Sequence, residues 1–329
     1  MGLHNSLSCG ASFLVKEERK MRKIGIIGLG HVGRLLAHDL VTTDKVDQLV
    51  LIDQDDDLAV GLKADLENAQ TALMTSTTIT IQDYAALKNA DILIAAFGDS
   101  QLLKEHQMAE LTRNGQAVEE IAPRVKQSGF SGIVLNISDP NEAITAYLQQ
   151  QLVLPPKRVV GIGTTIDTMR MRQAVAKAAQ LSSQNVSGFV YGQHDGEKVF
   201  AWSTVTVNGQ NLEKSINGHH LDQNKLGINA DLDNWYTLNG LGYNASAVVV
   251  WTIQIISAIL GSGELSVPLA IYQPQYEGYV SFPTLINRNG QGNPLLLNLY
   301  PVEEAAVKTA ANAIQQQIAI LQQGGEEND

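Results

Sequence analysis

Apolar residues in the first half of the chain form short unbroken runs, separated by stretches in which they recur every three or four positions. The runs are typical of strands buried on both faces of a parallel sheet, and the wider spacing is typical of helices. Strands are predicted at residues 23–27, 48–53, 79–81, 91–97, 132–137 and 158–160. Helices are predicted at residues 31–41, 58–69, 107–127 and 141–151, with a kink or break at Pro123. This alternation indicates an α/β fold of the Rossmann type, with a doubly wound parallel sheet.

The second half of the chain has a different pattern. A helix at 165–180 precedes short strands within 187–207, and residues 221–260 are mostly helical, with an interruption near Gly240 and Gly242. Three strands at 265–272, 279–285 and 295–299 are expected to form an antiparallel sheet before a closing helix at 301–321. The apolar stretch 245–260 contains polar residues, so it predicts a buried helix and not a membrane span. We therefore expect an α+β catalytic domain after the Rossmann domain.

A glycine-rich turn follows the first predicted strand. Gly28, Gly30 and Gly33 fit the pattern G-x-G-x-x-G, and Asp53 ends the second strand. In a dinucleotide-binding turn the first glycine permits the tight bend, the second lets the backbone approach the pyrophosphate, and the third lets the helix meet the strand. The following helix offers unpaired N–H groups to the phosphates. Because Asp53 accepts hydrogen bonds from the ribose and repels a 2′-phosphate, the sequence favours NAD over NADP.

These patterns divide the 329 residues into four parts. Residues 21–162 are expected to bind NAD, residues 163–322 to form the substrate and catalytic domain, and residues 323–329 to be a flexible tail. Residues 1–20 lack the basic start and long apolar middle of a secretory signal. They are expected to be either a flexible natural tail or a translated leader before a true start at Met21.

The charge balance excludes some classes of partner. A net charge of −11 and a pI near 5.1 argue against nucleic acid or an anionic membrane. The single cysteine, Cys9, excludes a disulfide within the chain and suits a reducing cytoplasm, which is the predicted location. A small anionic substrate stays compatible with this balance, because one local arginine can override the overall field.

Three polar residues have the order and spacing of a hydride-transfer site for a 2-oxo acid. Asp167 and Arg170 lie three positions apart on a predicted helix and so face the same side, and His194 lies in a glycine-bounded loop. Arg170 suits the substrate carboxylate, because a guanidinium binds it through two hydrogen bonds. His194 suits proton donation to the carbonyl oxygen, and Asp167 suits orientation of the imidazole.

Longer segments carry a family resemblance. The runs GLGHVG, ADILIAAFG, NISDP, GIGTTIDTMRMR and SGFVYGQHDG resemble the L-lactate/malate dehydrogenase family over essentially all of residues 21–322. The run AWSTV at 201–205 and the GLG-x-VG loop are most similar to its L-2-hydroxyisocaproate dehydrogenase branch. The resemblance implies an NAD-dependent oxidoreductase that forms a homodimer or homotetramer and acts on a small 2-oxo or 2-hydroxy monocarboxylic acid.

The resemblance also implies roles for individual residues. His194, Asp167 and Arg170 are the implied catalytic residues. The implied cofactor-binding residues are Gly28, Gly30, His31, Val32, Gly33, Asp53 and Gly98. The implied substrate-binding residues are Arg170, Gln101, Gln107, Asp139 and Asn244.

Gln107 is the first departure from the family pattern. The family carries an arginine on a loop that closes over the substrate and polarises its carbonyl, and counting from Gly98 to Arg113 without a gap places that position at Gln107. A neutral amide donates a hydrogen bond but supplies no charge. Losing one such electrostatic donor costs roughly 10²–10³ in turnover.

Asp139 is the second departure, because the family has Ser-Asn-Pro where this chain has Ser-Asp-Pro. An ionised Asp139 would favour a charged His194 and repel a carboxylate, whereas a protonated one could imitate the amide. Alternatively, Asp139 could turn outward and cap the following helix. Asn244 stands where the family usually has Thr, and Gln193 and Asp195 replace the usual Glu and Gly beside the histidine.

Other positions narrow the substrate and the ligands. Gln101 falls where lactate dehydrogenases carry Gln and malate dehydrogenases carry Arg, so malate is disfavoured. Ser187 replaces the histidine that binds a sugar bisphosphate in allosteric bacterial relatives, so no such activation is expected. No metal is assigned, because the adjacent pair His219 and His220 has no evident third ligand.

Three functional hypotheses follow. The first is an active L-2-hydroxy-acid dehydrogenase for lactate or a branched-chain analogue such as 2-hydroxyisocaproate, because the acid–base pair is retained. The second is a catalytically impaired NAD-binding relative with a regulatory or binding role, because Gln107 and Asp139 depart from the pattern. The third is a malate-type enzyme, which would need a cation at or near Gln101.

Overall fold

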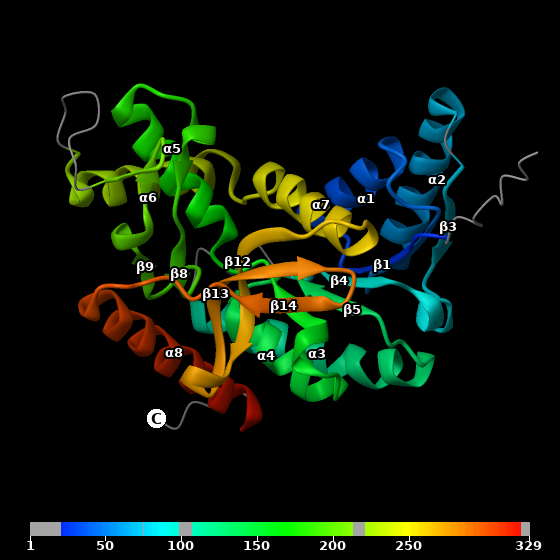
Figure 1. Cartoon of the computed structure of the whole chain (residues 1–329). Coiled ribbons are helices and arrows are strands. Elements are labelled where there is room, and N and C mark those ends of the chain that lie inside the picture. The colour runs from blue at the N-terminus through cyan, green and yellow to red at the C-terminus, as the bar shows by residue number, and fades with distance from the viewer. Residues whose placement is uncertain (1–20, 75, 99–106, 213–220, 324–329) are drawn as a thin grey trace, which may run out of the picture.

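The computed structural model describes residues 21–74, 76–98, 107–212 and 221–323. Six parallel strands run through the first half in the order β3-β2-β1-β4-β5-β6. Their bounds are β1 (Lys23–Ile27), β2 (Gln48–Ile52), β3 (Thr78–Ile81), β4 (Ile92–Ala95), β5 (Ile133–Asn136) and β6 (Val159–Gly161). The connecting helices are α1 (His31–Thr42), α2 (Asp56–Leu73), α3 (Gln107–Ser128) and α4 (Asn141–Leu152). The predicted doubly wound parallel sheet is therefore confirmed (Figure 1).

The strand order reverses between β1 and β4, which pair directly with Ile27 opposite Ala95. Ligands of open parallel sheets bind outside the carboxyl ends of the strands at such a reversal. The glycine turn after β1 and the segment after β4 therefore lie next to each other at one edge of the sheet. This relationship determines where the site forms.

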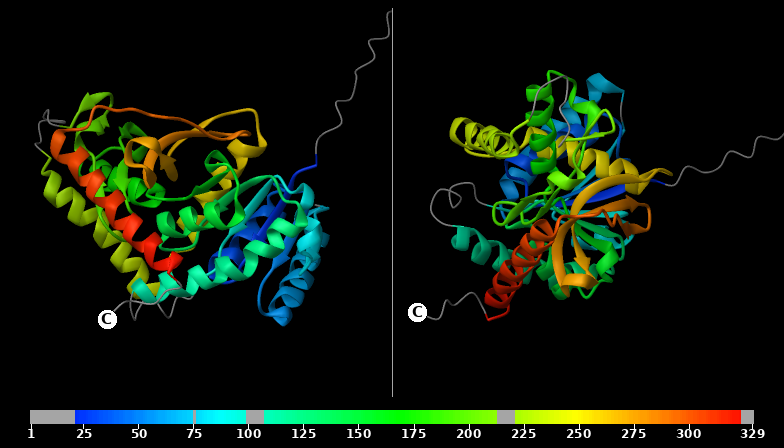
Figure 2. Two further views of the ribbon diagram at one scale, coloured as in Figure 1. Left: turned by 90° about the horizontal axis from the view of Figure 1, so that it is seen from below. Right: turned by 60° about the vertical axis from the view of Figure 1, so that its left-hand side comes forward.

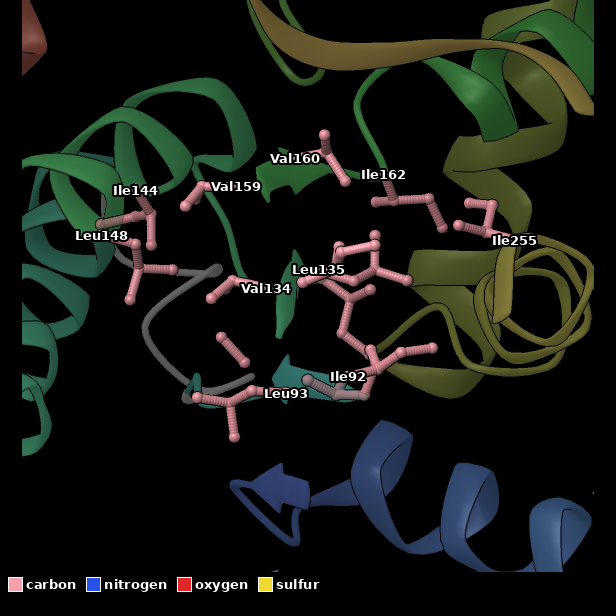
Figure 3. Packing of buried hydrophobic residues seen from close by; sticks show 14 of the residues in the cluster. Ile92, Leu93, Val134, Leu135, Ile144, Leu148, Val159, Val160, Ile162 and Ile255 are labelled. Carbon is pink, nitrogen blue, oxygen red and sulfur yellow. The ribbon is translucent and has the colours of Figure 1, made fainter. Parts of the chain in front are cut away.

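The core of this half is made by the apolar strand residues that the sequence pattern indicated. Val134 and Leu135 of β5 point to opposite faces, as successive strand residues must, and both are buried. Figure 3 shows Ile144 and Leu148 of α4 over one face and Ile255 over the other. Burial on both faces explains why these strands are apolar without alternation.

The second half of the chain extends the same sheet. Strand β12 pairs with β6 in the antiparallel sense at Ala270 and Gly161, and the order continues β12-β13-β8-β9, with β14 beside β13. A separate small sheet has the order β11-β10-β7. The bounds are β7 (Val186–Ser187), β8 (Val190–Gly192), β9 (Lys198–Phe200), β10 (Thr206–Val207), β11 (Gln210–Asn211), β12 (Leu265–Gln273), β13 (Gly278–Asn287) and β14 (Gly290–Pro294).

The described part of the second half also contains four helices. They are α5 (Thr165–Ala179), α6 (Gln223–Leu241), α7 (Ser246–Leu260) and α8 (Pro301–Gln322). Helices α5, α7 and α8 pack on these strands, and α6 packs on α5. The closing helix α8 lies against α4 and β13, so the C-terminal segment packs on the first half of the chain (Figures 1 and 2). A Rossmann sheet followed by a region with antiparallel strands agrees with the expected fold class.

Three local expectations differ from the structure. Helix α3 continues through Pro123 without a break, because its flanking turns pack against α4 and the segment 84–89. The third strand of the predicted antiparallel sheet is β14 (Gly290–Pro294), and residues 295–299, expected to be that strand, have no regular structure. Helix α7, predicted to be a buried helix, is buried on one side, where Ile255 and Ile256 lie, and is exposed on the other, where Val250 is 52% exposed.

Within the described residues, no single helix is long and apolar enough to span a membrane. Helices α6 and α7 reach the required length and hydropathy only when taken together, and they meet at an angle of 113°.

Candidate active site

The glycine turn after β1 is held closely against neighbouring backbone. Gly28 has a φ of +98°, and a Cβ there would lie 2.5 Å from the carbonyl oxygen of Ala96. A Cβ on Gly33 would collide with the carbonyl oxygen of Gly28. In contrast, a Cβ on Gly30 would meet no atom within 4 Å. The first and third glycines thus permit close packing, and the second leaves an open face of backbone where a pyrophosphate fits.

The amino end of α1 adjoins this open face. Gly30 is the N-cap of α1 and supplies no side-chain cap, so the first N–H groups of the helix have no partner from that residue. Such N–H groups and the positive end of the helix dipole attract phosphate. The turn therefore fits the phosphates of a dinucleotide.

Asp53 lies at the end of β2 beside the turn. Its Oδ2 accepts a hydrogen bond from the backbone N–H of Leu29 at 2.5 Å, and its backbone is fixed on both sides by the amide of Gln82. Asp53 and Gln82 also line a cavity of about 820 Å³, together with Tyr84 and Arg124. The carboxylate of Asp53 thus lies where it could accept hydrogen bonds from the ribose of a bound dinucleotide. This acceptor beside the glycine turn fits NAD.

The three polar residues of the proposed chemistry come together in space. His194 follows β8, and its Nδ1 lies 2.5 Å from Oδ2 of Asp167 on α5. The other carboxylate oxygen of Asp167, Oδ1, lies 3.5 Å from Nη1 of Arg170 and 3.6 Å from Nζ of Lys198. Asp167 is 3% exposed, so its carboxylate is held by three cationic groups out of contact with water.

This arrangement sets the charge of the pair. Burial would raise the pKa of the Asp167 carboxyl, but the His194 imidazole and the neighbouring cations outweigh it and lower the pKa to about 2. Burial would lower the pKa of His194, but the carboxylates of Asp167 and Asp195 outweigh it and raise the pKa well above its usual value. A charged His194 at neutral pH is a proton donor.

Arg170 is oriented by residues from two elements. Its Nη2 donates to Oδ1 of Asn244 at 3.1 Å, and Asn244 in turn donates to Asn234 at 3.0 Å. The Nη1 atom is buried and has no hydrogen-bond partner among the described residues. A buried guanidinium nitrogen without such a partner suits a carboxylate brought by a substrate.

A cavity of about 300 Å³ joins the glycine turn to His194 and Asn244, whereas Asp167 and Arg170 are not among its lining residues. His31, Val32 and Gly98 line it on the cofactor side, and Asp139, His194 and Asn244 line it on the other. The ring of His31 stacks on that of Tyr243 at a centroid distance of 3.9 Å, and both residues line the cavity. A dinucleotide and a small acid can therefore meet in one cavity.

Two carboxylates surround the reacting nitrogen of His194. Oδ2 of Asp195 lies 3.3 Å from Nε2 of His194, and Asp139 lines the same cavity. Burial raises the pKa of Asp139 to about 7, with the His194 charge lowering it and the Asp195 charge raising it further. The N-cap of α4 is Pro140 and makes no side-chain cap, so the alternative that Asp139 caps that helix is not observed.

Glu142 holds the backbone of the loop that carries His194. Its Oε1 accepts from the backbone N–H of His194 at 3.0 Å and from the hydroxyl of Ser281 at 2.5 Å. Burial raises the pKa of this carboxyl to about 7, against the effect of those two hydrogen bonds. Sequence reasoning missed Glu142, Lys198 and Tyr243, because nothing in their local spacing indicates that they adjoin residues dozens of positions away.

Two of the residues predicted to bind substrate lie wholly or partly outside the described residues. Gln101 is outside the described residues. Gln107 begins α3, and its side chain is outside the described part. The histidine pair at 219–220 is also outside it.

Comparisons with known proteins agree with this geometry. A family model described as the lactate/malate dehydrogenase NAD-binding domain matches residues 22–161. The chain is 28% identical to L-lactate dehydrogenase 2 of Lactococcus lactis subsp. lactis (strain IL1403), over 90% of this chain and 97% of the relative. It is also 28% identical to the L-lactate dehydrogenase of Priestia megaterium, over 90% and 96% of the two chains.

Solved structures show the same likeness. The ligand-bound minor L-lactate dehydrogenase of Enterococcus mundtii superimposes with a TM-score of 0.84 at 26% identity, over 91% of this chain and 98% of that one. The lactate dehydrogenase of Cryptosporidium parvum, complexed with lactic acid and nicotinamide adenine dinucleotide, shares the fold with a TM-score of 0.85 at 23% identity, over 92% and 98%.

Proposed function

The chain belongs to the lactate/malate dehydrogenase family, and from this premise we propose that it is an L-2-hydroxy-acid dehydrogenase for lactate or a branched-chain analogue such as 2-hydroxyisocaproate. Its cofactor is NAD. The observation that supports the proposal most strongly is the 2.5 Å contact between buried Asp167 and His194, because His194 lines a cavity shared with the glycine turn. That contact makes a proton donor beside a dinucleotide site, which is what reduction of a 2-oxo acid requires.

When bound, the cofactor would exchange a hydride with C2 of the substrate: NADH would give it in reduction, and NAD⁺ would take it in oxidation. Arg170 holds the substrate carboxylate through Nη1, while Nη2 stays on Asn244. His194 then gives the proton on Nε2 to the carbonyl oxygen and takes one back in the reverse direction. Asp167 stabilises the imidazolium and keeps Nδ1 protonated, so that Nε2 faces the substrate.

The proposed substrate is a monocarboxylate. Arg170, whose buried Nη1 has no hydrogen-bond partner among the described residues, is the proposed carboxylate clamp. The carboxylate of Asp195, 3.3 Å from Nε2 of His194, disfavours a second acidic group there. Gln101 supplies no cation at the position where malate dehydrogenases carry one. These residues support lactate or a larger apolar 2-hydroxy acid over malate.

The roles of the two halves of the chain are also proposed. Residues 21–162 hold NAD, and residues 163–322 supply Asp167, Arg170 and His194. The assembly is a homodimer or homotetramer, as the family resemblance implies.

A second candidate is an NAD-binding relative with impaired turnover and a regulatory or binding role. Asp195 favours this candidate, because its carboxylate lies 3.3 Å from Nε2 of His194. Nε2 is the atom that would give its proton to the substrate oxygen, so Asp195 competes with the substrate for it. The neutral Gln107 at the place of the family arginine favours this candidate too.

The test is NADH oxidation followed at 340 nm with pyruvate, 2-oxoisocaproate, phenylpyruvate and oxaloacetate, with NADH binding measured by fluorescence in the same preparation. Turnover with a monocarboxylate is the expected result, and the preferred acid gives the size of the pocket. NADH binding without turnover on any of the four acids would favour the impaired relative. Oxaloacetate as the best substrate would favour a malate-type enzyme.

A further inference from the structure

Three potential metal ligands converge in the cavity, where the family pattern leads one to expect only the histidine. Each of Asp139, His194 and Asp195 offers one ligand atom, and these atoms all lie within 4.8 Å of one another. The closest pair is Nε2 of His194 and Oδ2 of Asp195, at 3.3 Å. Two ligands of one small cation, each about 2.0–2.2 Å from it, have this kind of separation.

An unpartnered polar atom in the same cavity points independently to a ligand. Ser138 is 3% exposed and lines the cavity beside Asp139, and its Oγ has no hydrogen-bond partner among the described residues. A buried hydroxyl without a partner costs free energy unless a ligand or its bound water satisfies it. A hydrated cation held by the neighbouring carboxylate would do so.

The charge of the cavity wall favours a cation. Its described acidic residues are Glu110, Asp139 and Asp195, and its one described arginine is Arg34. Two further cations of the neighbourhood do not line the cavity: Arg170 contacts Asp167 and Asn244, and Lys198 contacts Asp167 and Asp231. Two carboxylates and one neutral imidazole would therefore neutralise a divalent ion.

We propose that Asp139, His194 and Asp195 form a binding site for a divalent transition-metal cation of the zinc type. Imidazole nitrogen with carboxylate oxygen suits Zn²⁺ and Co²⁺, whereas Mg²⁺ prefers an all-oxygen octahedron. Three protein ligands leave a fourth position of the tetrahedron open toward the cavity.

Occupation of this site has a consequence for catalysis, and this step rests on the proposed function. The cation takes the lone pair of Nε2, so His194 must lose its proton when the cation binds. An imidazole bound in this way cannot donate a proton to a 2-oxo acid. Zinc-type cations are therefore expected to inhibit reduction, and a chelator is expected to restore it.

The test is calorimetric titration of untagged, chelator-treated protein with Zn²⁺, Co²⁺ and Mg²⁺ in the absence of NADH. The expected result is one equivalent of Zn²⁺ and of Co²⁺ per chain, with much weaker binding of Mg²⁺. Because Co²⁺ absorbs visible light according to its coordination, its spectrum reports ligation without any turnover. The readout is thus independent of whether the protein is an active dehydrogenase.

Variants identify the ligands. Asp139→Asn and Asp195→Asn are each expected to weaken Zn²⁺ binding by at least about tenfold, the range found when groups that support a metal site are lost. Glu197→Gln removes an exposed carboxylate from the same loop and is expected to bind as the unaltered protein does. Melting temperatures show whether each variant is folded.

Two results would overturn the site. One is the absence of saturable Zn²⁺ binding to folded protein, and the other is an affinity that neither aspartate variant changes. Failure of the proposed function is recognised separately, as the absence of 2-oxo-acid reduction by chelator-treated protein that still binds Co²⁺.

Discussion

The Nδ1 atom of His194 lies 2.5 Å from Oδ2 of Asp167, although 27 positions separate the two residues in the chain. Asp167 is fixed on α5 and buried, whereas His194 lies on a loop. The helix residue therefore determines the orientation of the loop residue. This relationship makes His194 a directed proton donor.

Replacing Asp167 by Asn is expected to lower kcat/KM for 2-oxo-acid reduction by about 10²–10⁴, the range that general acid–base catalysis contributes. The amide keeps the volume of the side chain but supplies no charge to the imidazolium. The measurement is the initial rate of NADH oxidation at several substrate concentrations. Asp233→Asn, which removes a half-buried carboxylate 3.4 Å from Lys177, is the control and is expected to retain its rate. A similar loss in both variants would contradict the assignment.

The direction of the reaction should depend on pH through His194. Its pKa is raised well above 6.5 because the nearby carboxylates outweigh burial. Reduction needs the protonated form, so its rate is expected to stay constant through neutral pH and to fall only as pH rises through the raised pKa. Oxidation of the hydroxy acid should rise over the same interval. The free energy of folding that His194 contributes is present below the pKa of His194 in the unfolded chain. It is lost as pH rises through the raised pKa of His194 in the folded protein.

The pH profile of kcat/KM, recorded with a chelator present, tests this explanation. Asp195→Asn removes a carboxylate 3.3 Å from Nε2 and should move the falling limb to lower pH. Glu197→Gln, in the same loop but exposed, should leave the limb in place. An unaltered limb in the Asp195 variant would show that this carboxylate does not set the titration.

Gln107→Arg tests whether the missing charge limits turnover. The guanidinium would restore the cation that polarises the carbonyl, so kcat is expected to rise by roughly 10²-fold, the value of one such electrostatic donor. Gln116→Arg, an exposed position of the same helix, is the matched control. A fall in kcat for Gln107→Arg would show that the glutamine is adapted to the native substrate.

Two glycine variants separate cofactor binding from folding. Gly30→Ala places a methyl group in open space, so the melting temperature should stay near that of the unaltered protein while NADH binding weakens. Gly33→Ala should instead destabilise the fold, because its Cβ would collide with the carbonyl oxygen of Gly28. NADH fluorescence and thermal unfolding measure the two effects. Gly61→Ala, another open position, should leave NADH binding unaltered; equal NADH affinity in the Gly30 variant would count against the pyrophosphate site.

Glu142 should make stability depend on pH. Burial raises its pKa from 4.5 to about 7, so the neutral acid is the form that the fold prefers. The stability due to this proton is present below the unfolded pKa and is lost as pH rises through about 7. Glu142→Gln cannot ionise and so avoids that loss. The melting temperature of this variant minus that of the unaltered protein should therefore increase from pH 5 to pH 8. Glu67→Gln, on the exposed face of α2, should show no such trend.

The sequence determined the elements of the first half and the order of the chemistry along the chain. Apolar runs and helical spacing depend on each residue's own neighbours, so they predicted β1–β6 and α1–α4 to within a few residues. The spacing of Gly28, Gly30 and Gly33 predicted a dinucleotide turn for the same local reason. Asp167 and Arg170 share a face because a helix places residues three apart on one side.

Only the tertiary structure decided what surrounds His194. Glu142 beneath the loop lies 52 positions away, and Asn244 lies 74 positions from Arg170. The pairing of β6 with β12, which joins the two halves into one sheet, brings together Gly161 and Ala270, which are farther apart still in the chain. Such contacts depend on how strands order themselves in a sheet, and no local periodicity records that order. The cluster of Asp139, Asp195 and His194 arises in the same way, because the carboxyl end of β5 meets the loop after β8 only in the folded chain.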